Sequence, residues 1–284
     1  MQLTKDHISS LLPKRPRDAN KGTFGKVLVI AGSENYPGAA YLCCAAAYRV
    51  GAGLVSLATT PEVKIIVSRK LPEVTFLTFD EALEKISKAF LRIKDYDVLL
   101  LGPGLGQSVS TTKLVKELIG QKLPKTVIDG DGLNLLSKIN NWWTKFDGEV
   151  VLTPHPGEMS RLTSLTIEEI QSNRENTAKS FAKKWGMVVV LKGANTAVAS
   201  PTGEVGISPF ANPALATAGT GDILSGIIAG LASQGLSNFD ASCCGVYIHG
   251  LIGEMSKEKI GEAGVIASDL LPFLPKAITK IKTT

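Results

Sequence analysis

Apolar runs of three to five residues alternate along the chain with longer stretches in which small and polar residues mix with apolar ones. Short, continuous apolar runs are typical of strands that are buried on both faces, as the strands of parallel sheets are. The runs that we expect to form strands are 27–31, 54–58, 74–77, 98–101, 126–129, 150–152 and 187–191.

The stretches between these runs have helical length. We expect helices at 39–50, 61–70, 81–92, about 110–121, 132–138, 167–185, 220–232, 241–259 and 267–280. Residues 196–199 and 204–207 flank Ser200-Pro201-Thr202-Gly203, a turn sequence that predicts a β-hairpin. Strands that alternate with helices favour a mostly parallel central sheet with helices on both faces, here with an antiparallel edge. Because no repeat or linker interrupts this pattern, we expect one α/β domain over 1–284.

Composition and charge exclude several classes of protein. Hydrophobic residues make up 44% of the 284 and charged residues 20%, which is typical of a soluble globular protein. The net charge of +5 suits an anionic ligand, but lysine and arginine are dispersed and only 6% of residues are aromatic, so nucleic-acid binding is disfavoured. The N-terminus lacks a signal-peptide pattern, and no apolar run reaches transmembrane length. We therefore expect a cytoplasmic protein with no membrane partner.

The cysteines and histidines give little support to a metal site. The four cysteines form two adjacent pairs, Cys43-Cys44 and Cys243-Cys244, in stretches rich in alanine and glycine. This spacing matches no metal site, and we expect small buried side chains between packed helices. Since the chain has three histidines, a histidine-based site is also disfavoured, and we predict no protein ligand to a metal.

Polar, glycine-rich loops follow five of the predicted strands. They are 32–38, 102–106, 129–132, 153–158 and 192–196. Ligands of open α/β sheets bind outside the carboxyl ends of the strands, so these loops can line one cleft. Taken singly, each loop has a plain alternative: Lys192 as a solvated strand end, and His155 as part of a rigid turn between two prolines. Neither a phosphate-binding P-loop nor the dinucleotide-binding glycine fingerprint occurs.

The segment Ala218-Gly219-Thr220-Gly221-Asp222 directly precedes a long apolar helix. A helix N-terminus presents unpaired N–H groups and a positive dipole end, and glycines let a phosphate approach that backbone. Asp222, in the first helical turn, is placed to accept a proton from a substrate hydroxyl. The alternative is an ordinary Thr or Asp helix cap, and local physics gives the two interpretations equal weight.

That segment, with Gly226 one turn later, resembles the anion hole of ribokinase-like enzymes, whose aspartate is the base. Further stretches resemble, in order, the ADP/ATP-dependent NAD(P)H-hydrate dehydratases of that class. They are Lys21-Gly22-Thr23-Phe24-Gly25-Lys26, Ala31-Gly32-Ser33, Gly38-Ala39-Ala40, Gly51-Ala52-Gly53-Leu54-Val55, Gly102-Pro103-Gly104-Leu105-Gly106, Thr153-Pro154-His155-Pro156-Gly157-Glu158, Lys192-Gly193-Ala194-Asn195-Thr196 and Asn212-Pro213. The resemblance implies a ribokinase-like three-layer α/β/α sandwich.

The resemblance also implies a reaction and its residues. ATP or ADP would drive the return of (6S)-hydrated NADH and NADPH (NADHX and NADPHX) to NADH and NADPH, through phosphorylation of the hydrate hydroxyl and elimination of phosphate. Asp222 would be the catalytic base, and the substrate-binding residues would be Ala40, Gly104, His155 and Asp222. The nucleotide-binding residues would be Lys192, Gly193, Ala194, Asn195 and Thr196, with Gly219, Thr220 and Gly221 around the transferred phosphate. Mg²⁺ would neutralise the nucleotide phosphates.

The match to the family has two departures. The family often has Asp-Ala-Asp-Ala-Leu where this chain has Asp129-Gly130-Asp131-Gly132-Leu133, and each glycine loosens the following helix by ~1 kcal/mol. Both aspartates are present, so the chemistry is unaffected. Many bacterial members carry an N-terminal epimerase domain, for which 284 residues leave no room, so we expect a separate epimerase. The family further implies a homotetramer.

Two other functions stay open. A ribokinase-like kinase for small alcohols of thiamine precursor metabolism would share Gly219-Thr220-Gly221-Asp222 but not Thr153-Pro154-His155-Pro156 together with Gly38-Ala39-Ala40. A nucleotide-binding regulatory module would lack catalysis altogether. The sequence does not distinguish ATP from ADP, because either presents its terminal phosphate to the same anion hole.

Overall fold

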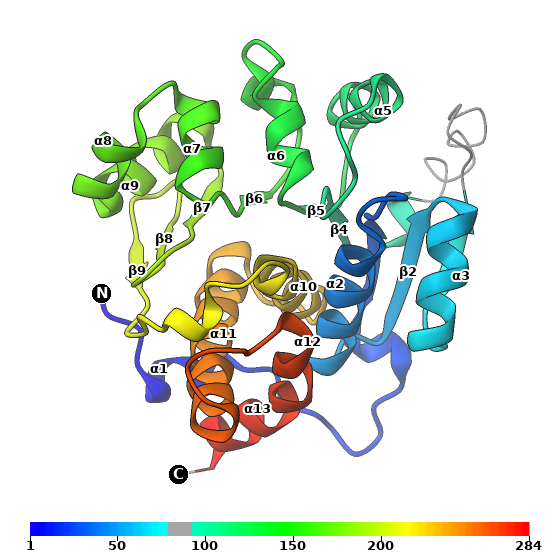
Figure 1. Ribbon diagram of the computed structural model, residues 1–284, viewed down its shortest axis with the longest axis vertical. Coiled ribbons are helices and arrows are strands. Elements are labelled where there is room, and N and C mark those ends of the chain that lie inside the picture. Colours follow the sequence, from blue (N-terminus) through cyan, green and yellow to red (C-terminus); the bar gives the residue numbers. More distant parts are fainter. Residues whose placement is uncertain (79–92, 284) are drawn as a thin grey trace.

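A computed structural model describes residues 1–78 and 93–283. In these residues the chain forms a nine-stranded sheet in the order β3-β2-β1-β4-β5-β6-β7-β8-β9 (Figure 1). The strands are β1 (Lys26–Ile30), β2 (Leu54–Thr59), β3 (Thr75–Thr78), β4 (Val98–Leu101), β5 (Lys125–Ile128), β6 (Val150–Leu152), β7 (Val188–Leu191), β8 (Ala197–Ala199) and β9 (Val205–Ile207). Strands β1 to β7 pair in parallel, whereas β8 and β9 pair antiparallel at one edge. This confirms the predicted mostly parallel sheet with an edge hairpin.

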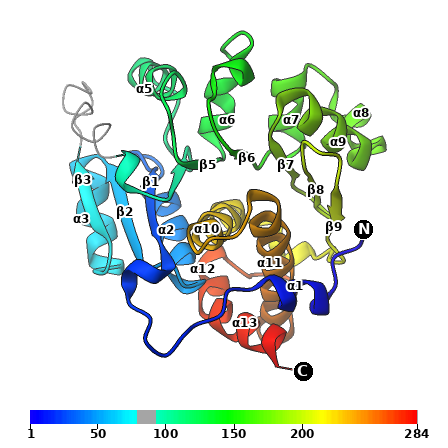
Figure 2. The ribbon, with the colours of Figure 1, turned by 180° about the vertical axis from the view of Figure 1, so that it is seen from behind.

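Helices cover both faces of the sheet and make the three layers (Figure 1, Figure 2). On one face lie α1 (Lys5–Leu11), α2 (Pro37–Arg49), α3 (Pro61–Lys70), α10 (Thr220–Ser233), α11 (Asn238–Ile260), α12 (Ala267–Leu270) and α13 (Leu274–Lys282). On the other lie α5 (Val109–Ile119), α6 (Asp131–Leu136), α7 (Pro156–Thr163), α8 (Ile167–Ser172) and α9 (Arg174–Trp185). Short 3₁₀ turns are η1 (Lys21–Phe24), η2 (Ile93–Asp95), η3 (Trp142–Lys145), η4 (Pro213–Leu215) and η5 (Leu271–Phe273). The helix predicted at 81–92 lies outside the described residues.

The strands are apolar throughout because each contributes to two cores. Side chains alternate between the faces of a strand. In β1, Val27 and Val29 join the core under α2 and α10, whereas Leu28 and Ile30 join the core under α5 and α6. A strand of this kind has no solvated face, which is why the sequence shows continuous apolar runs rather than alternation.

Helix α10 is buried almost completely and packs closely on α2. A Cβ added to Gly226 would lie 2.3 Å from the carbonyl oxygen of Cys43, so the glycine lets the two backbones approach. All four cysteines are buried and free, which confirms their predicted role as small packing residues. Although α10 is strongly apolar, none of the described helices has the length and hydropathy needed to cross a bilayer.

Two predicted helices are interrupted, and two helices were missed. The helix expected at 167–185 breaks at Asn173, which takes φ −146° and ψ 50° between α8 and α9. The helix expected at 267–280 becomes α12, η5 and α13, because Pro272 and Pro275 cannot donate a backbone hydrogen bond. The predictions also omitted α1 and α7, whose few apolar positions make too short a periodic signal.

Candidate active site

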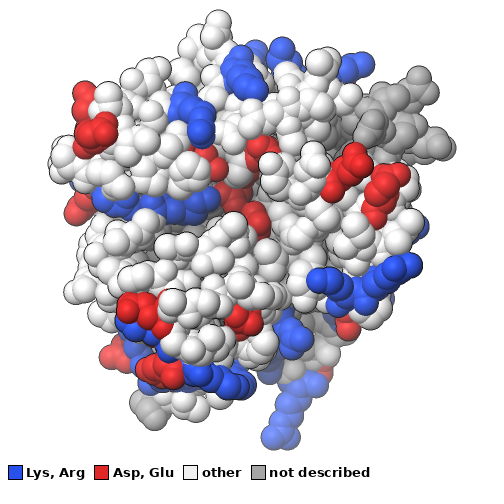
Figure 3. All heavy atoms as spheres, viewed as in Figure 1, with Lys and Arg blue, Asp and Glu red and all other residues white. Residues whose placement is uncertain are grey.

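The loops after five parallel strands meet at one edge of the sheet. Hydrogen bonds of 2.8–3.1 Å join them in sheet order: Gly32 N–H to Pro103 O, Asp129 N–H to Leu101 O, Thr153 N–H to Ile128 O and Lys192 N–H to Pro154 O. Acidic side chains gather in the hollow at the centre of this face (Figure 3). The predicted convergence of the loops on one cleft is therefore confirmed.

The N-terminus of α10 faces this cleft with free backbone donors. Gly219 precedes the helix at φ +91°, a left-handed conformation that favours glycine, and no side chain caps the helix. Within the described part of the chain, the N–H groups of Gly221 and Asp222 have no hydrogen-bond partner. The Thr220 hydroxyl instead donates backward, to the carbonyl oxygens of Leu215 and Thr217. The cap interpretation is therefore wrong, and the helix end remains free to bind an anion.

Lys192 lies directly over that helix end. A Cβ on Gly221 would be 3.4 Å from Lys192 Nζ, so the missing side chain keeps the space between them open. Nζ donates to Asp129 Oδ1 at 2.6 Å and lies 3.6 Å from Glu158 Oε2. The Lys192 side chain is only 17% exposed, so the alternative of a solvated strand end is wrong. Burial acts to lower the Lys192 pKa, but the charges of Asp129 and Glu158 outweigh it and raise the pKa overall.

Three carboxyl groups share this single ammonium. Burial and then the charge of Asp129 raise the pKa of Asp222 to about 7, although Lys192 acts to lower it. Burial also raises the pKa of Glu158 to about 7, again against Lys192. A carboxyl poised near neutral pH is suited to accept and release a proton. Asp222 therefore has the character of a general base beside an anion site.

His155 is fixed by the start of α7. Its Nδ1 accepts hydrogen bonds from the N–H groups of Gly157 and Glu158, and Glu158 Oε2 accepts from the His155 N–H at 2.7 Å. This reciprocal capping box explains why Pro-Gly-Glu after His155 begins a helix. Burial and the charge of Lys192 lower the His155 pKa, so the ring is neutral and its Nε2 carries the proton. His155 Nε2 lies 3.5 Å from Glu158 Oε1, and the residue lines the pocket instead of only filling a turn.

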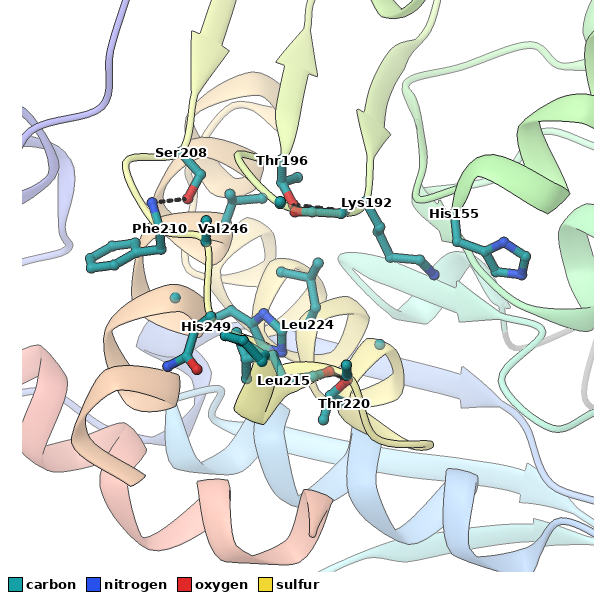
Figure 4. A pocket seen from close by; sticks show the side chains of 18 of the residues that line it. His155, Lys192, Thr196, Ser208, Phe210, Leu215, Thr220, Leu224, Val246 and His249 are labelled. Atoms are coloured by element: carbon teal, nitrogen blue, oxygen red, sulfur yellow. Dashed lines mark hydrogen bonds between the residues drawn. The ribbon is translucent and has the colours of Figure 1, made fainter. Parts of the chain in front are cut away.

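A pocket of about 600 Å³ extends from Lys192 and His155 toward α11 (Figure 4). The predicted residues that line it are His155, Lys192, Gly193, Ala194, Thr196, Thr220 and Gly221. Asn195 is absent from this lining and instead hydrogen-bonds to the segment that follows β9. At φ +52° it donates from its N–H to Phe210 O and from Nδ2 to Ser208 O. A nucleotide-binding role for Asn195 stays a prediction.

Gly104, on the loop after β4, and Ala40, in the first turn of α2, are both absent from the pocket lining. A Cβ on Gly104 would meet Ala39 Cβ at 2.7 Å, and the Gly104 carbonyl accepts from the Ser33 hydroxyl at 2.8 Å. Ala40 is completely buried in the core. A Cβ added to Gly32, on the loop after β1, would lie 2.9 Å from Ala40 Cβ, so Ala40 packs against that loop. The substrate-binding roles of Ala40 and Gly104 stay predictions.

Several residues of the site had no predicted role. Asp129 and Glu158 lay in the predicted loops, but no local pattern indicates that both contact Lys192, 63 and 34 positions away. The far end of the pocket is formed by Phe210, Leu215, Leu224, Val246 and His249. These residues come from η4, α10, α11 and the segment after β9, and no spacing rule connects such distant positions.

Comparisons with known proteins identify relatives along the whole chain. A family model described as NAD(P)H-hydrate dehydratase matches residues 27–276. The bifunctional NAD(P)H-hydrate repair enzyme Nnr of Moorella thermoacetica is 40% identical, over 99% of this chain and 54% of the relative. The ADP-dependent (S)-NAD(P)H-hydrate dehydratase of Bacillus subtilis is 34% identical, over 96% of each chain. The chain thus spans about half the length of its bifunctional relatives.

Solved structures agree with these relatives. A crystal structure of the Bacillus subtilis ADP/ATP-dependent NAD(P)H-hydrate dehydratase, co-crystallised with ATP and Mg²⁺, has a TM-score of 0.86 at 31% identity, over 98% of this chain and 97% of that one. A ribokinase-like superfamily protein of Enterococcus faecalis has a TM-score of 0.87 at 30% identity, over 99% and 96%. A hydroxyethylthiazole kinase of Pyrococcus horikoshii has a TM-score of 0.60 at 14% identity, over 96% and 92%, which is a likeness of fold alone. The predicted ribokinase-like sandwich is confirmed.

Proposed function

The chain belongs to the NAD(P)H-hydrate dehydratase family, and from this membership we propose that it returns (6S)-hydrated NADH and NADPH to NADH and NADPH at the expense of ADP or ATP. One observation carries the proposal. The free N–H groups at the start of α10 lie under Lys192 and next to Asp222, a carboxyl whose pKa of about 7 suits a base. Phosphoryl transfer to a hydroxyl needs this combination of anion site and base.

The adenine nucleotide would lie along the pocket. Its terminal phosphate would point to the N–H groups of Gly221 and Asp222, where the helix dipole favours negative charge. Lys192 would add a positive charge on the opposite side of that phosphate. The apolar far end of the pocket would exclude water from the rest of the nucleotide.

Asp222 would accept the proton of the hydrate hydroxyl as its oxygen attacks the terminal phosphorus and the shorter nucleotide leaves. The new phosphate ester has a good leaving group, whereas hydroxide does not. The lone pair of the ring nitrogen then expels phosphate with the electrons of the C–O bond. Loss of a proton from the neighbouring carbon restores the double bond of the reduced nicotinamide.

Mg²⁺ fits the charges of this site. Three carboxyls share one ammonium, so the site has excess negative charge before any phosphate enters. No set of His, Cys, Asp and Glu side chains in 1–78 and 93–283 forms a closed metal cage. Mg²⁺ is usually held by one or two carboxylates and by substrate phosphates. The nucleotide phosphates would hold the ion at this acidic end of the cleft, and the ion would neutralise charge on the transferred phosphate.

The rival function is phosphorylation of a small alcohol without elimination. The test mixes purified protein and Mg²⁺ with hydrated NADH and either ADP or ATP, and follows the absorbance of reduced nicotinamide. Recovery of NADH that requires the nucleotide supports the dehydratase. No recovery, together with phosphorylation of a thiazole or pyrimidine alcohol, contradicts it. The same measurement with ADP and ATP in turn determines the preferred nucleotide.

Other expectations from the sequence and from the family stay predictions. They are a single dehydratase domain, a homotetrameric assembly, a separate epimerase for the other epimer of the hydrate, and a cytoplasmic location. An epimerase matters chemically because a stereospecific dehydratase by itself would leave the other epimer of the hydrate unrepaired. Adding an epimerase to the repair assay should raise the recovered NADH toward completion.

A further inference from the structure

The apolar end of the pocket contains two buried polar atoms without a hydrogen-bond partner in the described residues. They are Nε2 of His249, on α11, and Nδ2 of Asn212, which caps η4. Both residues line the pocket. Figure 4 shows Phe210, Val246 and His249 on one side of it and Lys192 and His155 on the other. Because a buried polar atom without a partner costs free energy, two such atoms in one pocket indicate a ligand that supplies the partners.

The unpartnered atom of His249 is a hydrogen-bond acceptor. Burial lowers the pKa of His249 to about 4, so the ring is neutral and has one N–H group. A hydrogen bond to the backbone of Thr220 acts to raise that pKa, as expected of a ring N–H that donates to a carbonyl. We assign the ring proton to Nδ1, because Nε2 has no partner among the described residues. Nε2 is therefore left with a lone pair directed at no protein group.

The unpartnered atom of Asn212 is a donor. Its Oδ1 accepts a hydrogen bond from the Ala214 N–H at 2.9 Å, and this bond caps η4. The cap fixes which end of the amide is oxygen, so Nδ2 is the free group. An amide nitrogen donates and does not accept. The pocket wall thus offers one acceptor and one donor among apolar side chains.

This pair matches adenine, whose exocyclic amino group donates and whose ring nitrogens accept. A 6-oxopurine carries a carbonyl oxygen in place of the amino group and an N–H at N1. Its carbonyl oxygen, an acceptor, would face the acceptor of His249, and its N–H, a donor, would face the donor of Asn212. We propose that His249 Nε2 accepts from the adenine amino group and that Asn212 Nδ2 donates to an adenine ring nitrogen, so that the two residues select adenine over 6-oxopurine nucleotides. The proposal rests on the proposed function, because it requires a nucleotide in this pocket.

The test is calorimetric binding of ADP and IDP, without the hydrated dinucleotide. IDP keeps the ribose and phosphates of ADP and changes only the 6-position and N1. We expect wild-type protein to bind ADP about 10-fold more tightly than IDP. His249→Leu should weaken ADP binding about 10-fold and leave IDP binding nearly unchanged, so the preference disappears.

Three further variants separate recognition from damage to the fold. Asn212→Asp keeps the oxygen that caps η4 and replaces the donor by an acceptor, so it should weaken ADP and not IDP. His249→Gln provides an amide oxygen and should recover part of the preference. Val246→Ala, in the same pocket, should weaken both nucleotides alike. Thermal melts of each variant verify that it is folded.

Each contrary outcome has a definite meaning. Equal losses for ADP and IDP in His249→Leu would overturn the proposal and leave the nucleotide site intact. A preference for ADP over 2′-deoxy-ADP that disappears in this variant would assign Nε2 to the ribose, and would also overturn it. If neither ADP nor IDP binds the wild-type protein, the proposed function itself fails.

Discussion

At the scale of single residues, the raised pKa of Asp222 suits a catalytic base but lowers the stability of the folded protein when the carboxyl is ionised. Burial, the charge of Asp129 and that of Glu158 raise its pKa, and Lys192 only partly opposes them. A carboxyl kept in such surroundings is destabilised when ionised, and an incoming phosphate with its metal ion changes that balance. The same charges that prepare Asp222 to hold a proton therefore weaken the folded state at high pH.

Asp222→Asn tests whether Asp222 is the catalytic base. The amide keeps the shape of the side chain but cannot accept a proton, so the rate of NADH recovery should fall by about 10²–10⁴-fold. ADP affinity should change little, because the free N–H groups and Lys192 remain. A variant that keeps its full rate would support the interpretation as a regulatory module. In the wild-type enzyme kcat/KM should rise with pH through about 7, as Asp222 ionises.

Asp222→Asn also tests the cost in stability. The pKa of this carboxyl is about 7 in the folded protein and near its ordinary value of 3.8 when unfolded. Its extra proton binding therefore stabilises the fold at low pH, and this contribution is lost as pH rises through 7. At pH 8 the variant should melt above the wild type, by ~2–4 °C for each kcal/mol recovered, and the difference should shrink at pH 5. A variant that melts lower at pH 8 would contradict this account.

At the scale of elements, α10 serves two purposes at different points along its length. The backbone N–H groups of its first turn are free to bind an anion. Its middle packs closely against the backbone of α2. Glycine is needed in both places for different reasons. At Gly221 a side chain would enter the ligand space below Lys192, whereas at Gly226 it would collide with the backbone of Cys43.

Matched substitutions separate these two purposes. Gly221→Ala should weaken ADP binding by about 10-fold or more, since its methyl group would approach the ammonium to 3.4 Å. Its effect on folding should be small or favourable, by up to ~1 kcal/mol, because alanine stabilises helices. Gly226→Ala should lower the melting temperature by several degrees and leave the ADP affinity of the folded fraction unchanged. Calorimetry and thermal melts on both variants measure the contrast, and a reversed pattern would contradict it.

At the scale of the whole molecule, the site exists because the sheet is parallel. Strands that all run the same way bring their carboxyl ends, and the loops after them, to one edge. The residues that matter most are therefore far apart in sequence: Asp129 follows β5 and Lys192 follows β7, yet their side chains meet at 2.6 Å. Residues of η4, α10 and α11 line the other side of the pocket.

Assembly is a property of the whole molecule that stays a prediction. Apolar side chains at the starts of α2 and α12 and on α3 remain exposed, among them Tyr36 at 57%, Ile266 at 56% and Ile65 at 54%. If the homotetramer forms, light scattering should give four times the 30.1 kDa of one chain. Ile65→Glu should then reduce the mass if α3 lies in an interface, whereas a surface change such as Lys113→Glu on α5 should not. A monomeric wild-type protein would contradict the prediction.

The sequence by itself determined the layout of the fold and the position of the site. Buried strands are recognised as apolar runs, and turns are recognised by their glycines. The site is expected at the five loops that follow strands, because ligands of parallel sheets bind at the carboxyl ends of the strands. These features depend on residues close together in the chain, so local patterns reveal them. The same locality explains the errors at Asn173, Pro272 and Pro275, where single residues interrupt a periodic pattern.

Only the tertiary structure decided the surroundings of the site residues. The hydrogen bonds at the start of α10 exclude a side-chain cap, and the pKa of Asp222 depends on charges that Asp129 and Glu158 bring from other parts of the sheet edge. Burial and through-space charge set a pKa, and neither follows from sequence spacing. The unpartnered atoms of Asn212 and His249 became visible only when η4 and α11 came to line one pocket. The sequence thus indicated where the candidate site lies, and the packing of distant elements gave its residues their burial, charges and hydrogen bonds.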